Sequence, residues 1–183
     1  MEGNARAALL ESVIEHLAEH GLGGATLRSI ASAIGTSHRM LIYHFGSRDG
    51  LLLAIVRRVE EQQRAAMAEL AADPGGSTAD LARRMWERVA DPRVQPHARL
   101  FFELYGRALQ GDPGAAPMLE WVVPTWVDEL TALLVDRGLP ADEARATARL
   151  GLATVRGLLL DLLATGDRAG ADAAHELYVG RLG

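Results

Sequence analysis

The chain has 183 residues, of which 49% are hydrophobic and 23% are charged, and its mean hydropathy is near zero. A single fold of this size buries about 70% of its unfolded surface, so we expect a soluble globular protein rather than a disordered chain. The absence of cysteine excludes disulfides, thiol nucleophiles and cysteine-ligated zinc or iron–sulfur sites.

Two features of the sequence predict a cytoplasmic protein with no membrane association. No run of about 18 uncharged apolar residues occurs, which excludes an ordinary membrane-spanning helix. Residues 1–21 also carry acids through their apolar stretch, where a signal peptide would carry none.

The charge is unevenly distributed along the chain. The formal net charge is −5, and all 19 basic residues are arginine. Residues 25–58 nevertheless contain five arginines and one acid, which gives this segment a local charge of 5 − 1 = +4. A local basic segment in an acidic protein is compatible with binding to an anionic partner such as DNA.

Helical periodicity runs through the N-terminal part of the chain. Apolar residues at the i, i+3, i+4, i+7 spacing predict a helix over residues 5–20 that ends at Gly21. Thr26 and Ser37 are good N-caps and predict two short helices, the first ending at Gly35 and the second covering residues 38–45.

The rest of the chain predicts longer helices and no strand. A long helix follows Ser47 to about residue 72, and further helices are expected at 78–90, 96–110, 115–136, 142–165 and 170–182. The helix at 115–136 should be kinked or broken at Pro124. The sequence therefore predicts an all-α protein.

The two short helices and the three residues that join them have the dimensions of a helix-turn-helix. Leu41 and Phe45 lie four residues apart and would anchor the second helix on the core, which turns its other residues toward solvent or DNA. Backbone amides at the starts of this helix and of the long helix would face phosphates, with charge added by Arg28 and Arg48. The pattern by itself equally fits two packed helices without DNA.

Residues 25–55, ATLRSIASAIGTSHRMLIYHFGSRDGLLLAI, resemble the TetR family of bacterial transcriptional repressors. The resemblance rests on the spacing of Thr26, Ile30, Ala31, Gly35, Ser37, Leu41, Tyr43, His44, Phe45, Ser47 and Leu51. It implies a three-helix DNA-binding domain at residues 1–50, joined by a long helix to a helical ligand-binding and dimerisation domain at 51–183. It also implies a homodimer that reads a palindromic operator and is released from it by a small molecule.

The resemblance also assigns roles to individual side chains. Tyr43, His44 and Thr26 would hold phosphates, whereas the start and exposed face of the second short helix would lie near bases. Arg39 fits guanine readout and phosphate contact equally well. Local capping or packing is the alternative for His44. The expected DNA-binding residues are Thr26, Arg28, Thr36, Ser37, His38, Arg39, Ile42, Tyr43, His44 and Arg48.

Aromatic residues concentrate in the predicted second domain and suggest a site for a largely apolar effector. Such residues also commonly fill a helical core. Two acids, Glu103 and Asp161, interrupt apolar runs there. Each would select a cationic ligand, pair with an arginine such as Arg107 or Arg156, or simply be exposed to solvent. The candidate ligand-binding residues are Trp86, Phe101, Phe102, Glu103, Tyr105, Met118, Trp121, Trp126 and Asp161.

The helix at 142–165 carries two apolar stripes, one more than its own domain needs. The stripe with small residues permits close approach of another helix, so residues 141–165 and 170–182 with their copies would form a four-helix dimer interface. Burial within a single-chain bundle is the alternative. The expected interface residues are Leu150, Ala153, Gly157, Leu160, Ala164, Leu177 and Tyr178.

Residues 16–20, HLAEH, fit the H-x-x-E-H pattern of zinc metallopeptidases. Val13 and Leu17 define the buried face of that helix, which leaves the histidines on its flank without a third ligand. We therefore expect no metal, no cofactor and no enzyme, but a DNA-binding regulator. A ligand-independent DNA-binding module and a small helical metallohydrolase are the alternatives.

Overall fold

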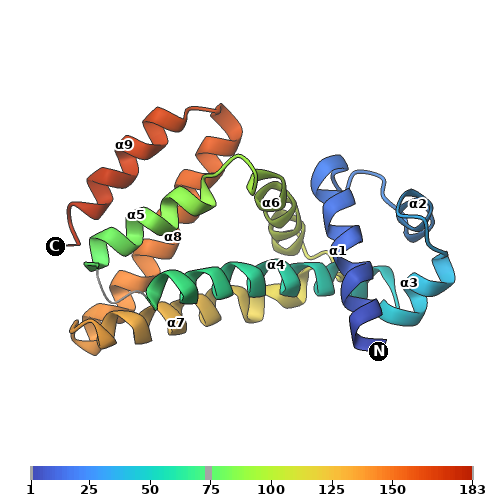
Figure 1. Ribbon diagram of the computed structural model, residues 1–183, viewed down its shortest axis with the longest axis horizontal. Helices are drawn as coiled ribbons and strands as arrows, with labels where there is room; N and C mark the ends of the chain where they lie inside the picture. The colour runs from blue at the N-terminus through green and yellow to red at the C-terminus, as the bar shows by residue number, and fades with distance from the viewer. Residues whose placement is uncertain (1, 73–75, 183) are drawn as a thin grey trace. The chain divides into compact units, whose positions relative to one another are not determined.

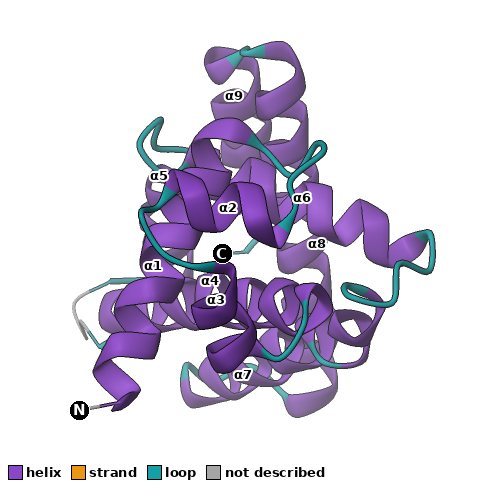
Figure 2. Cartoon of the chain, turned by 90° about the vertical axis from the view of Figure 1, so that its right-hand side faces the viewer, coloured by secondary structure: helices purple, strands orange, loops and turns teal. Residues whose placement is uncertain are grey.

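The computed structural model describes residues 2–72 and 76–182, and this part of the chain consists of helices joined by loops, with no strand (Figures 1 and 2). The elements are α1 (Glu2–His20), α2 (Leu27–Ala33), α3 (His38–Phe45), α4 (Arg48–Ala71), α5 (Thr78–Val89), α6 (Gln95–Leu109), the 3-10 helix η1 (Ala116–Glu120), α7 (Val122–Asp136), α8 (Ala141–Thr165) and α9 (Arg168–Val179). The all-α prediction is confirmed.

One predicted helix differs from the observed structure. The expected helix at 115–136 is divided before Pro124, because η1 ends at Glu120 and α7 begins at Val122. Pro124 lies in the first turn of α7, where its missing N–H removes no intrahelical hydrogen bond. Pro124 therefore falls within the start of a helix and does not kink one.

Among the described residues, no helix combines the length and apolarity needed to cross a membrane.

The first compact unit consists of residues 1–61 and 96–120. It holds α1, α2, α3, α6, η1 and the N-terminal part of α4, and α2 packs against both α1 and α3. Its core is made of side chains that are almost completely removed from solvent, among them Ile14, Leu17, Leu41, Leu51, Ile55, Leu104 and Met118. Residues 96–120, which are distant in sequence from residues 1–61, therefore complete this core.

The second compact unit consists of residues 62–95 and 121–183. Here α8 packs against α7 and α9, and α5 packs against α9. One apolar cluster joins Met67, Leu81 and Trp126, and another joins Leu134, Ala144 and Ala148. These compact units do not test the expected boundary at residue 50 between a DNA-binding domain and a ligand-binding and dimerisation domain, which stays a prediction.

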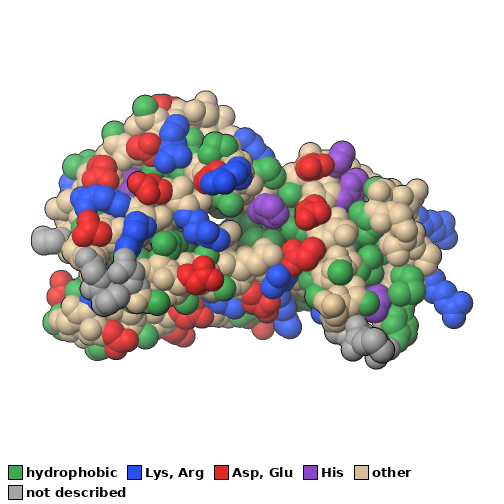
Figure 3. Space-filling view, viewed as in Figure 1, with side chains coloured by type: hydrophobic (Ala, Val, Ile, Leu, Met, Phe, Trp, Pro, Cys, Tyr) green, Lys and Arg blue, Asp and Glu red, His purple; other side chains and the backbone are tan. Residues whose placement is uncertain are grey.

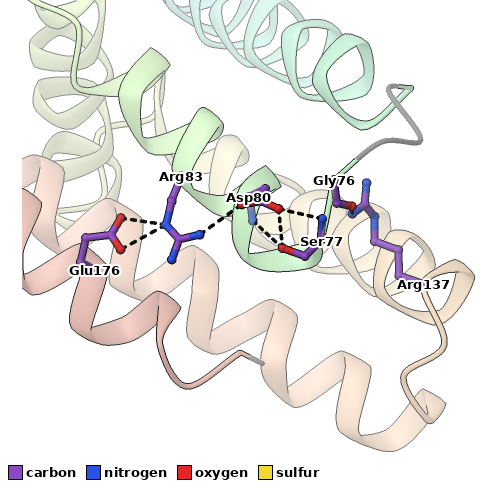
Figure 4. Close-up of polar contacts among 6 residues, drawn as sticks. All are labelled: Gly76, Ser77, Asp80, Arg83, Arg137 and Glu176. Carbon is purple, nitrogen blue, oxygen red and sulfur yellow. Dashed lines mark hydrogen bonds and ion pairs between the residues drawn. The ribbon is translucent and has the colours of Figure 1, made fainter.

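Polar side chains connect helices of the second unit at its surface (Figure 4). Arg83 of α5 donates from Nε to Glu176 of α9 at 3.0 Å, and its Nη1 pairs with Asp80 at 3.2 Å. Asp80 and Ser77 form the capping box that begins α5. This arrangement ties the start of α5 to α9 without burying a charge.

A buried histidine lies beneath this surface. His175 of α9 is fully buried, its ring stacks on Trp86 with centroids 5.1 Å apart, and neither ring nitrogen has a hydrogen-bond partner among the described residues. The Trp86 indole instead donates to Asp172, which also accepts from Arg168. Burial, together with repulsion from Arg83, lowers the pKa of His175 below its ordinary value of 6.5 despite the nearby acids Glu176 and Asp172.

These observations predict that acid destabilises the second unit. Because the pKa of His175 is lower in the folded state, the unfolded chain takes up this proton first as the pH falls below about 6.5. We expect the free energy of unfolding to decrease from about pH 7.5 to about pH 5.5 in urea titrations. His175→Phe keeps a ring on Trp86 and should flatten this dependence, whereas the control His38→Gln, at an exposed position, should not. A His175→Phe protein as acid-sensitive as wild type would contradict the interpretation.

Candidate nucleic-acid interface

Local capping and a glycine turn define the helix-turn-helix. Thr26 caps α2 and forms a capping box with Ser29, and Ser37 caps α3 by accepting a hydrogen bond from the Met40 amide at 3.2 Å. Gly35, between the two helices, has a φ of 70°, a left-handed conformation that a side chain would strain. These local signals explain why the two short helices begin and end where the sequence predicts.

The core fixes the orientation of α3. Leu41 is fully buried and Phe45 is almost so, which places both on the inner side of the helix. Ile42 is 38% exposed and Tyr43 is 66% exposed, although both have large apolar surfaces that burial would favour. An eight-residue helix therefore presents an unusually apolar face to solvent next to its polar residues.

All ten residues expected to contact DNA are accessible. Thr26, Arg28, Ser37, His38, Arg39, Ile42 and Tyr43 are exposed, and Thr36, His44 and Arg48 are half-buried. In the space-filling view, arginine side chains project from the surface at the right of Figure 3, where apolar side chains also gather. Accessibility is compatible with DNA contact, but the individual roles stay predictions.

Met40 was not among the expected residues, yet it is 41% exposed on α3. Helical spacing places Met40 one turn before His44 and next to Arg39, so it borders the same surface. Its type gave no signal in the sequence, because a methionine in a short amphipathic helix is ordinarily assigned to the core.

The corner between α3 and α4 is closely packed. The Gly46 amide, at a φ of 76°, caps α3 by donating to the Ile42 carbonyl. A Cβ placed on Gly50 would lie 2.1 Å from the Phe45 carbonyl oxygen, so the first turn of α4 approaches the end of α3 as only glycine permits. Nearby, a Cβ on Gly114 would lie 2.7 Å from an Asp49 oxygen. The end of α3 and the start of α4 are thus held as one rigid corner.

Glu103 of α6 has its partners within the first unit. Its carboxylate accepts a hydrogen bond from the Leu22 amide at 3.0 Å and pairs with Arg107 at 2.8 Å. This is the ion-pair alternative for Glu103, and the Leu22 bond attaches the loop after α1 to α6. Asp161, the other acid considered as a ligand contact, is exposed on α8.

The expected ligand-binding residues divide between the two units. Phe101, Phe102, Glu103, Tyr105 and Met118 belong to the first, whereas Trp86, Trp121, Trp126 and Asp161 belong to the second. Within the first unit the Phe101 and Tyr105 rings lie 5.6 Å apart. Within the second, Trp86 and Trp126 are core residues, and the buried Trp121 Nε1 has no hydrogen-bond partner in the described part of the chain. Neither unit by itself gathers the whole set.

The expected dimer residues form an exposed apolar surface on α8 and α9. Leu150, Leu160 and Leu177 are 58%, 52% and 65% exposed. Three small residues of α8 are also exposed. Ala153 and Gly157 lie between the two α8 leucines in sequence, and Ala164 follows the second of them. Tyr178 is half-buried instead, because its hydroxyl lies against Gly151, where a Cβ would come within 2.7 Å of it.

The histidines of the HLAEH segment interact with each other. The His16 and His20 rings stack with centroids 4.5 Å apart, and His20 Nδ1 bonds to the His16 carbonyl at 2.9 Å. Since a carbonyl only accepts, His20 Nδ1 carries the proton. The described residues contain no group of three or more metal-ligating side chains, so no third ligand completes the pattern. This geometry does not favour a metallohydrolase.

Sequence comparison places the N-terminal part of the chain among known regulators. Residues 9–55 match the sequence model of the family described as "Bacterial regulatory proteins, tetR family". The chain is 35% identical over 92 residues to the HTH-type transcriptional repressor AcnR of Corynebacterium glutamicum, a match that covers 47% of each protein. It therefore spans about half the length of that repressor. The HTH-type transcriptional regulator BetI of Stenotrophomonas maltophilia is 26% identical, covering 96% of this chain and 89% of BetI.

Solved structures show the same fold over nearly the whole chain. A transcriptional regulator from Rhodococcus sp. Rha1 superposes with a TM-score of 0.81 at 25% identity, covering 97% of this chain and 95% of that one. The multidrug binding protein EbrR, solved with imidazole, gives a TM-score of 0.69 at 26% identity, covering 99% of this chain and 89% of EbrR. These neighbours match both the N-terminal helix-turn-helix and the helices that follow it.

Proposed function

We propose that the chain is a member of the tetR family of bacterial regulatory proteins and, from this premise, that it is a dimeric transcriptional repressor, not an enzyme, acting in the cytoplasm. The observation that carries the proposal is the face of α3. Leu41 and Phe45 hold the helix on the core, so Arg39, Ile42 and Tyr43 are left exposed together. An arginine beside apolar groups suits the major groove, where guanine presents two acceptors and thymine a methyl group.

The proposed operator is two-fold symmetric. One eight-residue helix contacts too few phosphates to hold a single subunit firmly, whereas a dimer doubles these contacts and places two α3 helices in successive major grooves about 34 Å apart. Selection of bound sequences from random DNA tests this directly. Enrichment of palindromic sites supports the proposal, and the absence of any enrichment contradicts it.

Two substitutions on α3 should separate base readout from phosphate contact. Arg39→Ala should flatten base preference at one position in each half-site and weaken the selected operator by about 1 to 3 kcal/mol per contact. Tyr43→Phe removes only a hydroxyl and should weaken all DNA sequences alike. Binding titrations against the operator and its single-base variants measure both effects. If Arg39→Ala weakens every sequence equally, Arg39 is a phosphate contact and the base-readout assignment is wrong.

The apolar surface of α8 and α9 supports dimerisation. Three leucines more than half exposed would be costly in water, because each buried leucine side chain contributes about 1.5 to 3 kcal/mol relative to exposure. The small residues between them permit a second copy of α8 to approach closely. A second copy of this chain is therefore the proposed occupant of this surface.

Gly157→Leu should convert the dimer to a monomer. The substitution is open to a clean test because nothing lies within 4 Å of a Cβ at Gly157, so the protomer itself accommodates a side chain. The control Ala132→Leu places a leucine side chain at an exposed position on α7. Sedimentation should show a monomer for Gly157→Leu and a dimer for the control and wild type. A stable Gly157→Leu dimer would place the interface elsewhere.

We further propose that a largely apolar small molecule releases the operator. The support is the aromatic content of both units and the likeness to EbrR, which is described as a multidrug binding protein. The ligand would favour a conformer whose two α3 helices no longer match successive major grooves. A ligand-independent DNA-binding module is the alternative, and the test below separates them.

Ligand and operator should oppose each other reciprocally. All three tryptophans lie in the second unit, so their fluorescence reports ligand binding there. A compound from a screen of apolar and cationic aromatic molecules should change this fluorescence and weaken DNA binding over the same concentration range. Operator DNA must then weaken ligand binding by the same factor, typically about 5- to 150-fold. Compounds that saturate the protein yet leave DNA affinity unchanged would favour the ligand-independent module.

A further inference from the structure

Arg6 of α1 contacts the end of α3, although the two segments are far apart in sequence. Its Nε donates a hydrogen bond to the His44 carbonyl at 3.2 Å, and its Cζ lies 5.1 Å from the centroid of the Phe45 ring. Arg6 is exposed and was not among the expected DNA contacts. The contact therefore places a cationic side chain at the end of α3, against the His44 carbonyl and the Phe45 ring.

The chemistry of both contacts favours this position for arginine. The last carbonyls of a helix have no intrahelical partner and carry partial negative charge, so a cation there satisfies an acceptor and opposes the helix dipole. A guanidinium above an aromatic ring gains a further cation–π attraction. A guanidinium has five N–H donors, and the His44 carbonyl occupies only the one on Nε.

No acid pairs with Arg6 among the side chains that the structure describes, those of residues 4–72 and 76–182. Its contacts there are a neutral carbonyl and a ring, whereas Arg58 pairs with Glu11 and Arg107 pairs with Glu103. An exposed guanidinium whose described contacts are a neutral carbonyl and a ring is available to attract a phosphate. Its two terminal amino groups match the oxygens of a phosphate in a bidentate geometry.

We propose that Arg6 is an additional DNA-phosphate contact and that it also positions the last turn of α3. Its Nε would stay on the His44 carbonyl while its terminal amino groups bind a phosphate next to those held by Tyr43 and His44. This inference rests on the proposed DNA-binding function. One side chain from α1 would thereby connect the recognition helix to the DNA backbone.

The salt dependence of binding tests the phosphate contact. Arg6→Gln removes the charge but keeps an N–H donor for the His44 carbonyl, so full-length protein should fold with a thermal midpoint close to wild type. On the selected operator, the slope of log affinity against log salt should decrease by about 0.9 per subunit, or about 1.8 per dimer. Base preference should not change, because phosphate contacts carry no sequence information directly.

Two matched variants make the experiment decisive. Arg99→Gln removes one charge from an exposed arginine of α6 and should leave the slope unchanged. Arg6→Lys keeps the charge and should retain a slope near that of wild type. If Arg6→Lys flattens the slope as much as Arg6→Gln, the electrostatic contact is wrong.

The remaining outcomes separate this inference from the proposed function. Arg6→Gln could lower the affinity at every salt concentration without changing the slope of log affinity against log salt. That result would reduce Arg6 to a support for α3 and overturn the phosphate contact. Arg6→Gln affinities equal to those of wild type at every salt concentration would also overturn the phosphate contact. Wild-type protein that selects no DNA would instead overturn the proposed function itself.

Discussion

The burial of Leu41 and Phe45 determines which face of α3 is available to DNA. A helix of two turns is not stable by itself in water, so its existence and its rotation depend on these two side chains and on the Ser37 cap. A shift of the anchor by one residue would turn the helix by about 100° and bury part of the polar face. The exposed face of α3 is therefore a consequence of core packing, and Gly50 allows the start of α4 to pack closely against the end of α3.

Local features of the structure could be predicted from the sequence, and long-range contacts could not. Thr26, Ser37 and Gly35 act on residues within one turn, so the bounds of the short helices follow from the sequence alone. The Arg6 contact with His44 and the Glu103 contact with Leu22 join residues 38 and 81 positions apart. Periodicity indicates that a face is buried, but it does not identify the segment that covers it.

The aromatic residues show a second limit of sequence reasoning. A tryptophan in a ligand pocket and a tryptophan in a core have the same type and the same helical spacing. Trp86 is placed by partners on α9, since it stacks on His175 and donates to Asp172. Burial would raise the pKa of Asp172, but its hydrogen bonds from Trp86 and Arg168 outweigh that effect and lower it. None of these partners is adjacent to Trp86 in sequence.

The net charge of −5 does not oppose DNA binding, because the field at a phosphate depends on nearby charges. At about 0.1 M salt, exposed charges more than about 10 Å apart are largely screened from each other. Acids in α1 and α6 pair with Arg58 and Arg107, which removes those two arginines from the basic total of the first unit. Residues 25–58 contain five arginines and one acid, Asp49, so this segment stays basic even when Arg58 is discounted for its pairing with Glu11. The distribution of acids thus leaves a net positive charge on the segment that contains α3.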